Sequence, residues 1–151
     1  MRGIHILGIA AILTLIQSCG GSSTSTPTPA PTPQPTPPQP IVITQINRTL
    51  SPGYFFPNTI ATTRTGTLTV QFAWTSAQNR MSIGVANSSC TVEAYQNFNC
   101  SFLVQDATPS ATPVKTLTVA NLAAGTYVVI VDNFGPGDES YNYVVTLTPT
   151  S

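Results

Sequence analysis

Charged side chains are scarce in this chain. Five basic and five acidic residues cancel, and only 7% of the residues are charged, against about 25% in an ordinary domain. A surface made mainly of Thr, Ser, Asn and Gln offers neither a basic stripe for nucleic acid nor a strong field to steer a charged substrate. We therefore expect no nucleic-acid partner.

Histidine is almost absent as well. The one histidine, His5, lies in the N-terminal apolar segment, and Ser-His-Asp catalysis, Cys-His catalysis and most zinc sites require this side chain. A glycosidase needs two facing carboxyl groups, and the acidic candidates are few: Glu93, Asp106, Asp132, Asp138 and Glu139. We expect a protein that is not an enzyme.

Helix-forming residues such as Glu and Lys are rare, and no window shows a helical apolar stripe. Beyond residue 41, apolar and polar residues alternate with the period of a β-strand. The alternating apolar sets are Leu68/Val70/Phe72/Trp74, Met81/Ile83/Val85 (against Ser82, Gly84 and Ala86), Leu117/Val119 and Tyr141/Tyr143/Val145/Leu147. Residues 127–131 are apolar on both faces, which predicts a central strand.

Turn-forming residues separate these runs, at residues 51–53, 57–58, 79, 87–89, 107–109, 121–125 and 134–138. Residues 41–151 have the length of one domain of about 110 residues. We predict an all-β fold, an antiparallel β-sandwich of about eight strands with jelly-roll or Greek-key connections.

The N-terminus has the features of an export signal. Arg2 precedes an apolar stretch from Ile4 to Ile16, which is shorter than the ~20 residues of a spanning helix. Ile16-Gln17-Ser18-Cys19 then resembles the lipobox of bacterial lipoproteins, although Gln17 is unusual there. A buried core helix is the alternative reading, but a Gly/Ser/Thr/Pro tract follows instead of a domain.

The lipobox resemblance implies three further expectations. Residues 1–18 are a signal peptide that is cleaved, and the thiol of Cys19 carries the acyl chains that attach the protein to a membrane. Residue 20 is glycine, not the aspartate that retains such proteins at the inner membrane, so we expect attachment to the outer membrane of the cell envelope.

Residues 19–40 comprise the lipidated cysteine and a Gly/Ser/Thr/Pro-rich linker. The proline-alternating part, residues 27–40, favours an extended polyproline II path of roughly 40 Å. We interpret it as a spacer that holds the next domain away from the membrane. A ligand for proline-recognition modules is the alternative.

Two further cysteines, Cys90 and Cys100, are ten positions apart. They bracket a strand-like segment, residues 91–95, and a turn-like segment, residues 96–99, so a disulfide could join the two arms of a hairpin. Such a bond is favoured outside the cytoplasm and would add roughly 2–3 kcal/mol of stability. A metal site is the rival reading, but it lacks further ligands at close spacing.

Two places are candidate binding sites. Asp132, Asp138 and Glu139 flank a glycine-rich turn whose oxygens could hold Ca²⁺, although such residues also suit an ordinary turn. No other cofactor is expected. The aromatic residues Tyr54, Phe55, Tyr95 and Phe98 lie near predicted loops; they could stack against sugars, or they could simply be core residues.

Gly125-Thr126-Tyr127 opens the strand-like segment 125–131, and a Tyr-rich strand follows at residues 141–147. This arrangement resembles the end of bacterial pre-peptidase C-terminal domains, and the similarity extends over residues 48–148. The family often has aspartates where this chain has Gln78-Asn79-Arg80, so their role is not carried over.

The resemblance implies a non-catalytic sandwich module that acts in secretion or in binding to surfaces and polymers. Two functions therefore remain open. One is a binding module for a polysaccharide or an envelope protein. The other is a structural or accessory lipoprotein that partners another envelope or secreted protein and has no small ligand.

Overall fold

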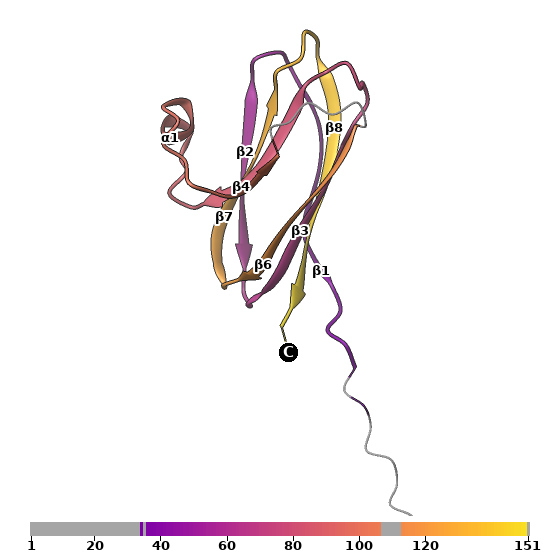
Figure 1. The fold of residues 1–151 in the computed structure, drawn as a ribbon, viewed down its shortest axis with the longest axis vertical. Helices are drawn as coiled ribbons and strands as arrows, with labels where there is room; N and C mark the ends of the chain where they lie inside the picture. The colour runs from indigo at the N-terminus through magenta and orange to yellow at the C-terminus, as the bar shows by residue number, and fades with distance from the viewer. Residues whose placement is uncertain (1–33, 35, 107–112, 151) are drawn as a thin grey trace, which may run out of the picture. The chain divides into compact units, whose positions relative to one another are not determined.

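The computed structural model describes residues 34, 36–106 and 113–150, and its secondary structure lies within one compact unit, Pro35–Ser151 (Figure 1). Cys19 and residues 107–112 fall outside the described residues. The elements are β1 (Ile41–Leu50), β2 (Phe55–Thr62), β3 (Gly66–Trp74), β4 (Met81–Asn87), α1 (Val92–Gln96), β5 (Phe102–Asp106), β6 (Val114–Leu122), β7 (Gly125–Asn133) and β8 (Glu139–Pro149).

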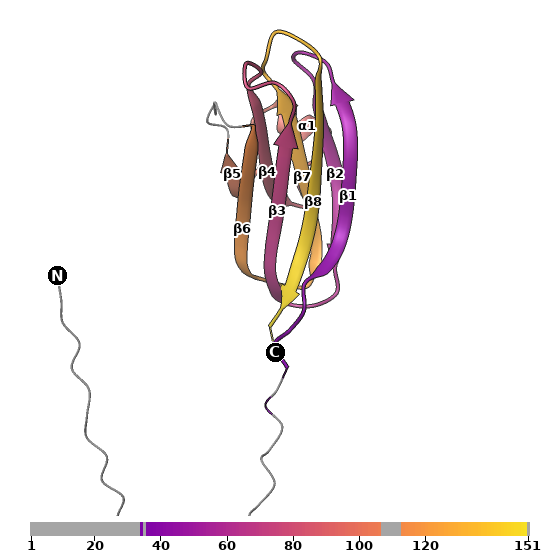
Figure 2. The ribbon, with the colours of Figure 1, turned by 90° about the vertical axis from the view of Figure 1, so that its right-hand side faces the viewer.

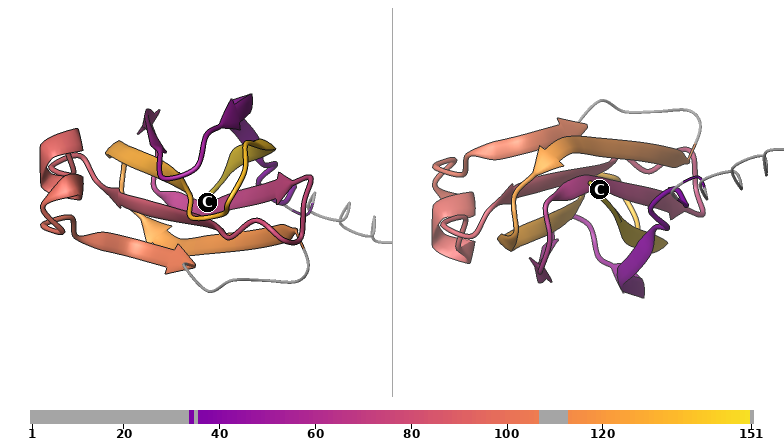
Figure 3. Two further views of the ribbon diagram at one scale, coloured as in Figure 1. Left: turned by 90° about the horizontal axis from the view of Figure 1, so that it is seen from above. Right: turned by 90° about the horizontal axis from the view of Figure 1, so that it is seen from below.

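The strands form two four-stranded sheets, in the orders β1-β8-β3-β6 and β2-β7-β4-β5, with every pairing antiparallel. Figures 2 and 3 show the two sheets packed face to face. From β1 to β7, each strand except β4 is followed by a strand of the opposite sheet, and β4 is followed by β5 of its own sheet. This is jelly-roll connectivity, so the predicted all-β antiparallel sandwich of about eight strands is confirmed.

The core lies between the sheets and is built by the alternating residues that the sequence indicates. Leu68, Val70 and Phe72 of β3 and Tyr143, Val145 and Leu147 of β8 are all buried. In the opposite sheet, β7 lies between β2 and β4 and has buried residues on both faces. The prediction of a central strand at residues 127–131 is therefore confirmed.

Strand β4 departs from the predicted alternation. Ser82, Gly84 and Ala86 were expected on an exposed face, but every residue from Met81 to Ala86 is buried. The outer face is covered because the β4–β5 connection and Phe102 of β5 pack against the apolar cluster that includes Ala86. The ring of Phe102 lies where a Cβ on Gly84 would be, 2.6 Å from Phe102 Cε1, so this approach requires glycine.

The turn predicted at Pro57-Asn58 is wrong, because both residues lie within β2, opposite Ile130 and Val129 of β7. Strand β2 is an edge of its sheet. A proline, which has no N–H to donate, is tolerated on an edge strand that has a partner on one side only.

The strand expected at residues 91–95 is also wrong, because this segment forms the short helix α1. The Thr91 hydroxyl accepts a hydrogen bond from the N–H of Ala94 at 3.1 Å, which is a helix N-cap. Among the described residues, no helix is long and apolar enough to cross a membrane.

Cys90 and Cys100 form a disulfide, as the sequence predicts. Cys90 follows β4 and Cys100 precedes β5. The disulfide therefore links the adjacent ends of two antiparallel strands that pair with each other. Their Cα atoms are 4.9 Å apart. The segment between them must therefore leave the sheet and return, and α1 forms within this closed loop.

Candidate functional site

An open pocket of about 600 Å³ lies where α1 and its flanking loop meet the outer side of the β2-β7-β4-β5 sheet, the side from which α1 projects in Figure 1. We call it the aromatic pocket. Its lining includes five aromatic residues, Phe55, Tyr95, Phe98, Phe102 and Phe134, and three polar ones, Gln96, Gln105 and Asp132. Gly53 and Cys100 complete it.

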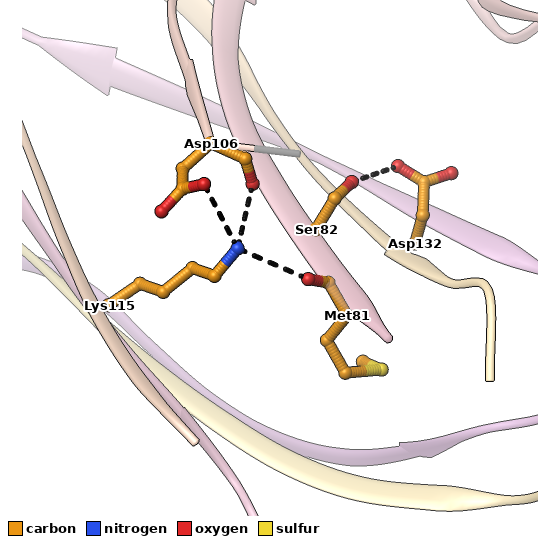
Figure 4. Close-up of polar contacts among 5 residues, drawn as sticks. All are labelled: Met81, Ser82, Asp106, Lys115 and Asp132. Atoms are coloured by element: carbon orange, nitrogen blue, oxygen red, sulfur yellow. Dashed lines mark hydrogen bonds and ion pairs between the residues drawn. The ribbon is translucent and has the colours of Figure 1, made fainter. Parts of the chain in front are cut away.

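Sheet register places Asp132 on this outer face. In β7, Val129 and Val131 point into the main core, whereas Val128 and Ile130 join a smaller apolar cluster with Phe55, Tyr95 and Phe102 outside it. Asp132 continues the outward alternation. Ser82 of β4 lies directly opposite Asp132 in the ladder, and its hydroxyl donates to Asp132 Oδ2 at 3.0 Å (Figure 4).

Tyr95 connects α1 to the sheet. Its ring lies between Phe55, with centroids 4.7 Å apart, and Phe102, with centroids 6.2 Å apart. Its hydroxyl donates to Asp132 Oδ2 at 2.5 Å. One side chain of the helix is thus held by two aromatic contacts and one charge-assisted hydrogen bond, which fixes α1 over the pocket.

Asp132 is 6% exposed. Burial raises the pKa of this carboxyl, and the hydrogen bonds from Tyr95 and Ser82 offset only part of the rise. Burial and the neighbouring Asp132 also raise the pKa of Tyr95, so its phenol stays protonated and acts as a donor. Both bonds end on Oδ2, and within the described ranges Oδ1 of Asp132 accepts no hydrogen bond.

The rim of the pocket exposes large aromatic rings. Phe98 is 95% exposed and Phe134 is 57% exposed. Phe98 also has φ +57° at the position after the C-cap of α1, where glycine is the usual residue and a side chain costs roughly 1 kcal/mol or more. A phenylalanine that is both strained and solvated does nothing for stability, and such residues are frequent at binding sites.

The structure brings three of the four predicted aromatic candidates, Phe55, Tyr95 and Phe98, into the aromatic pocket. Tyr54 is 67% exposed and does not line it, although it adjoins Phe55.

The calcium candidates are not brought together. Glu139 faces Thr75, Ser76 and Asn79, whose groups donate to both of its carboxylate oxygens. Asp132 faces Tyr95 and Ser82, and Asp138 is exposed. Over residues 36–106 and 113–150, no group of three or more His, Cys, Asp and Glu side chains is placed to hold a metal ion.

Sequence reasoning did not identify the other seven lining residues as part of an aromatic binding site. They are Gly53, Gln96, Cys100, Phe102, Gln105, Asp132 and Phe134. The apolar run of residues 102–104 could have indicated a strand there. The position of Asp132 beside Tyr95 could not have been found, because it follows from how α1 packs on β7.

Lys115 was also missed. Its Nζ lies 3.1 Å from Asp106 Oδ1 and donates to the carbonyl oxygens of Asp106 and Met81 at 3.2 and 3.3 Å (Figure 4). The ammonium is 5.8 Å from the ring centroid of Trp74. Strand β6 is thus tied to β4 and β5 of the other sheet.

No protein-family model matches the chain, and no curated protein matches it. Its fold is similar to that of PliG, a periplasmic lysozyme inhibitor of g-type lysozyme from Aeromonas hydrophila. The TM-score is 0.52, with 12% identity over 70% of this chain and 86% of that one.

A carbohydrate-binding module of a Cellvibrio mixtus lichenase, solved with cellotriose, aligns with a TM-score of 0.42 and 10% identity. The alignment covers 74% of this chain and 100% of that one. At such low identity, similarity to solved structures concerns the β-sandwich fold alone. The resemblance to pre-peptidase C-terminal domains stays a prediction.

Proposed function

We propose that this protein is a non-catalytic, lipid-anchored protein of the cell envelope that displays a β-sandwich binding module, with the aromatic pocket as its binding site. The exposed, strained Phe98 at the pocket rim is the observation that carries the proposal. Its ring can contribute binding energy only when a ligand covers it. The fold is shared with a periplasmic inhibitor protein, so it is compatible with binding in the envelope.

Phe98→Gly tests this binding role. Glycine suits the positive φ of residue 98 and removes the ring, so we expect unchanged or slightly higher stability and at least about tenfold weaker binding. The purified full chain in mild detergent is immobilised and challenged with polysaccharide and protein fractions of its own envelope. Val92→Ser is the control, because Val92 is 50% exposed on α1 but does not line the pocket. Equal retention by Phe98→Gly and the parent would contradict the proposal.

The lipid anchor is proposed at Cys19, which would attach the chain to the outer membrane through acyl chains. Cys19→Ser should abolish incorporation of labelled palmitate and move the protein from the membrane to the soluble fraction. If the variant still fractionates with membranes and still incorporates label, the lipobox interpretation is wrong.

An accessory lipoprotein without a small ligand is the second candidate. The exposed rings of Phe98, Phe134 and Tyr54 favour it, because aromatic residues are enriched at protein interfaces. In the same capture experiment, one stoichiometric protein retained without any glycan would support it.

A further inference from the structure

Asp132 carries the only formal charge in the lining of the aromatic pocket. Within the described part of the chain, Lys115 forms an ion pair with Asp106, and no cationic side chain pairs with Asp132. A carboxylate that is 6% exposed is held at an energetic cost unless a cation or several donors compensate its charge.

The two hydrogen bonds that Asp132 does accept, from Tyr95 and Ser82, both end on Oδ2. In Figure 4 the other carboxylate oxygen points away from Ser82. This second oxygen accepts no bond from the described residues but is not fully buried, and the residue lines an open pocket, so the oxygen is available to a donor that comes from outside the chain. A charged donor would form the stronger bond.

The walls of the pocket suit a cation. Phe55, Tyr95 and Phe102 line the same pocket as Asp132, and ring faces attract alkylammonium and guanidinium groups within about 6 Å. The alkyl stem of such a side chain would pack on the same rings. A neutral ligand would pack against the rings but would leave the charge of Asp132 uncompensated.

The rim favours a macromolecule over a free amine. Phe98 and Phe134 are exposed beside the pocket mouth, and a free amine seated at Asp132 would leave them in water. A partner protein covers them. Aromatic residues and arginine are enriched in protein interfaces.

We infer that the aromatic pocket binds the lysine or arginine side chain of a partner protein, with Asp132 as its counter-ion. This inference rests on the proposed binding function and names the chemistry of the partner.

The test compares the full chain with Asp132→Asn, using capped tripeptides as probes. Asparagine keeps the shape, and its Oδ1 can still accept from Tyr95 and Ser82, so the pocket should stay intact. The probes are Gly-Lys-Gly and Gly-Arg-Gly, with Gly-Gln-Gly as the neutral match, and binding is followed by amide shifts at Tyr95, Gln96 and Gln105. Asp138→Asn removes the same charge from an exposed site.

We expect the basic peptides to bind the parent and Asp138→Asn, and to bind Asp132→Asn at least about tenfold more weakly. The glutamine peptide should not bind. Basic peptides that shift no pocket amides, or that bind Asp132→Asn as well as the parent, would overturn the inference.

Two further probes, glucosamine and glucose, distinguish failure of this inference from failure of the proposed binding function. Glucosamine binding that depends on Asp132, without binding of the peptides, would identify an amino sugar and overturn the protein partner. An envelope polysaccharide retained equally by the parent and Asp132→Asn, but not by Phe98→Gly, would overturn the cationic ligand and leave the binding function standing.

Discussion

The hydroxyl of Tyr141 is buried without a hydrogen-bond partner among the residues that the structure describes. Its ring packs in the main core against Phe72, with centroids 5.9 Å apart. An unsatisfied buried hydroxyl is destabilising, because it loses its bonds to water and gains none. The contribution of Tyr141 to stability therefore comes from its ring and not from its hydroxyl.

Tyr141→Phe should therefore raise the free energy of unfolding by about 1 kcal/mol, as measured by urea denaturation. Tyr54→Phe, at a position that is 67% exposed, is the control and should change little. A loss of stability in Tyr141→Phe would mean that the hydroxyl has a partner.

Glu139 is the opposite case, a buried carboxylate that is fully hydrogen-bonded. Burial raises its pKa, but the hydrogen bonds from Thr75, Asn79 and the backbone of Ser76 outweigh this effect, and the net pKa is lowered. A lowered folded-state pKa means that the stabilisation is complete above the ordinary pKa of 4.5 and is lost as the pH falls through the folded-state value.

Glu139→Gln should lower the free energy of unfolding by about 1–3 kcal/mol at neutral pH, because its amide NH₂ would face a donor. The difference from the parent should shrink in acid. Urea denaturation at pH 7 and below pH ~4 checks both points. Asp138→Asn, at the exposed neighbour, should show neither effect.

At the scale of the element, the helix α1 is stabilised by contacts outside its own backbone. A helix of five residues is not stable by itself. Three features hold it: the Thr91 cap, the Cys90–Cys100 disulfide and the contacts of Tyr95. Tyr95, Gln96 and Phe98 all lie in this closed loop, so one wall of the pocket depends on the position of the loop.

Replacing both Cys90 and Cys100 by alanine should lower the free energy of unfolding by about 2–3 kcal/mol. It should also release α1, and with it the Tyr95–Asp132 hydrogen bond, so the amide of Tyr95 should lose protection in hydrogen exchange. Amides of β3 and β8 should stay protected. Unchanged protection at Tyr95 would show that its side-chain contacts suffice.

The sequence predicts the strands better than it predicts this helix. Alternation at Leu68–Trp74 and Tyr141–Leu147 is a local property, since successive side chains of a strand face opposite sides. Residues 91–95 have strand-like composition, yet the disulfide closes the segment and the cap of Thr91 starts a helix. The turn predicted at Pro57 is wrong for a similar reason. Proline is tolerated in a strand at the edge of a sheet, and the sequence does not show that β2 is an edge strand.

At the scale of the whole molecule, the two sheets are joined mainly by apolar packing, and Lys115 adds hydrogen bonds and an ion pair between them. It lies on β6, and its ammonium reaches the carbonyl of Met81 on β4 and Asp106 on β5 (Figure 4). Such a bond across the open side of a sandwich restrains how the sheets sit on each other.

Lys115→Met keeps the alkyl stem beside Trp74 but removes the ammonium. We expect a loss of about 1–3 kcal/mol in the free energy of unfolding, measured by thermal or urea denaturation. Arg80→Met, at an exposed position, is the matched control. If the two variants are equally stable, Lys115 contributes only its stem.

The sequence by itself determined the strand periodicity, the inward faces of β3 and β8, the central position of β7, the pairing of Cys90 with Cys100 and the aromatic candidates Phe55, Tyr95 and Phe98. These follow from local spacing and composition. The tertiary structure alone decided the pocket, because Phe55, Tyr95, Phe102 and Asp132 come from four different elements. They meet through strand register and the packing of α1, and both depend on contacts between residues far apart in the chain.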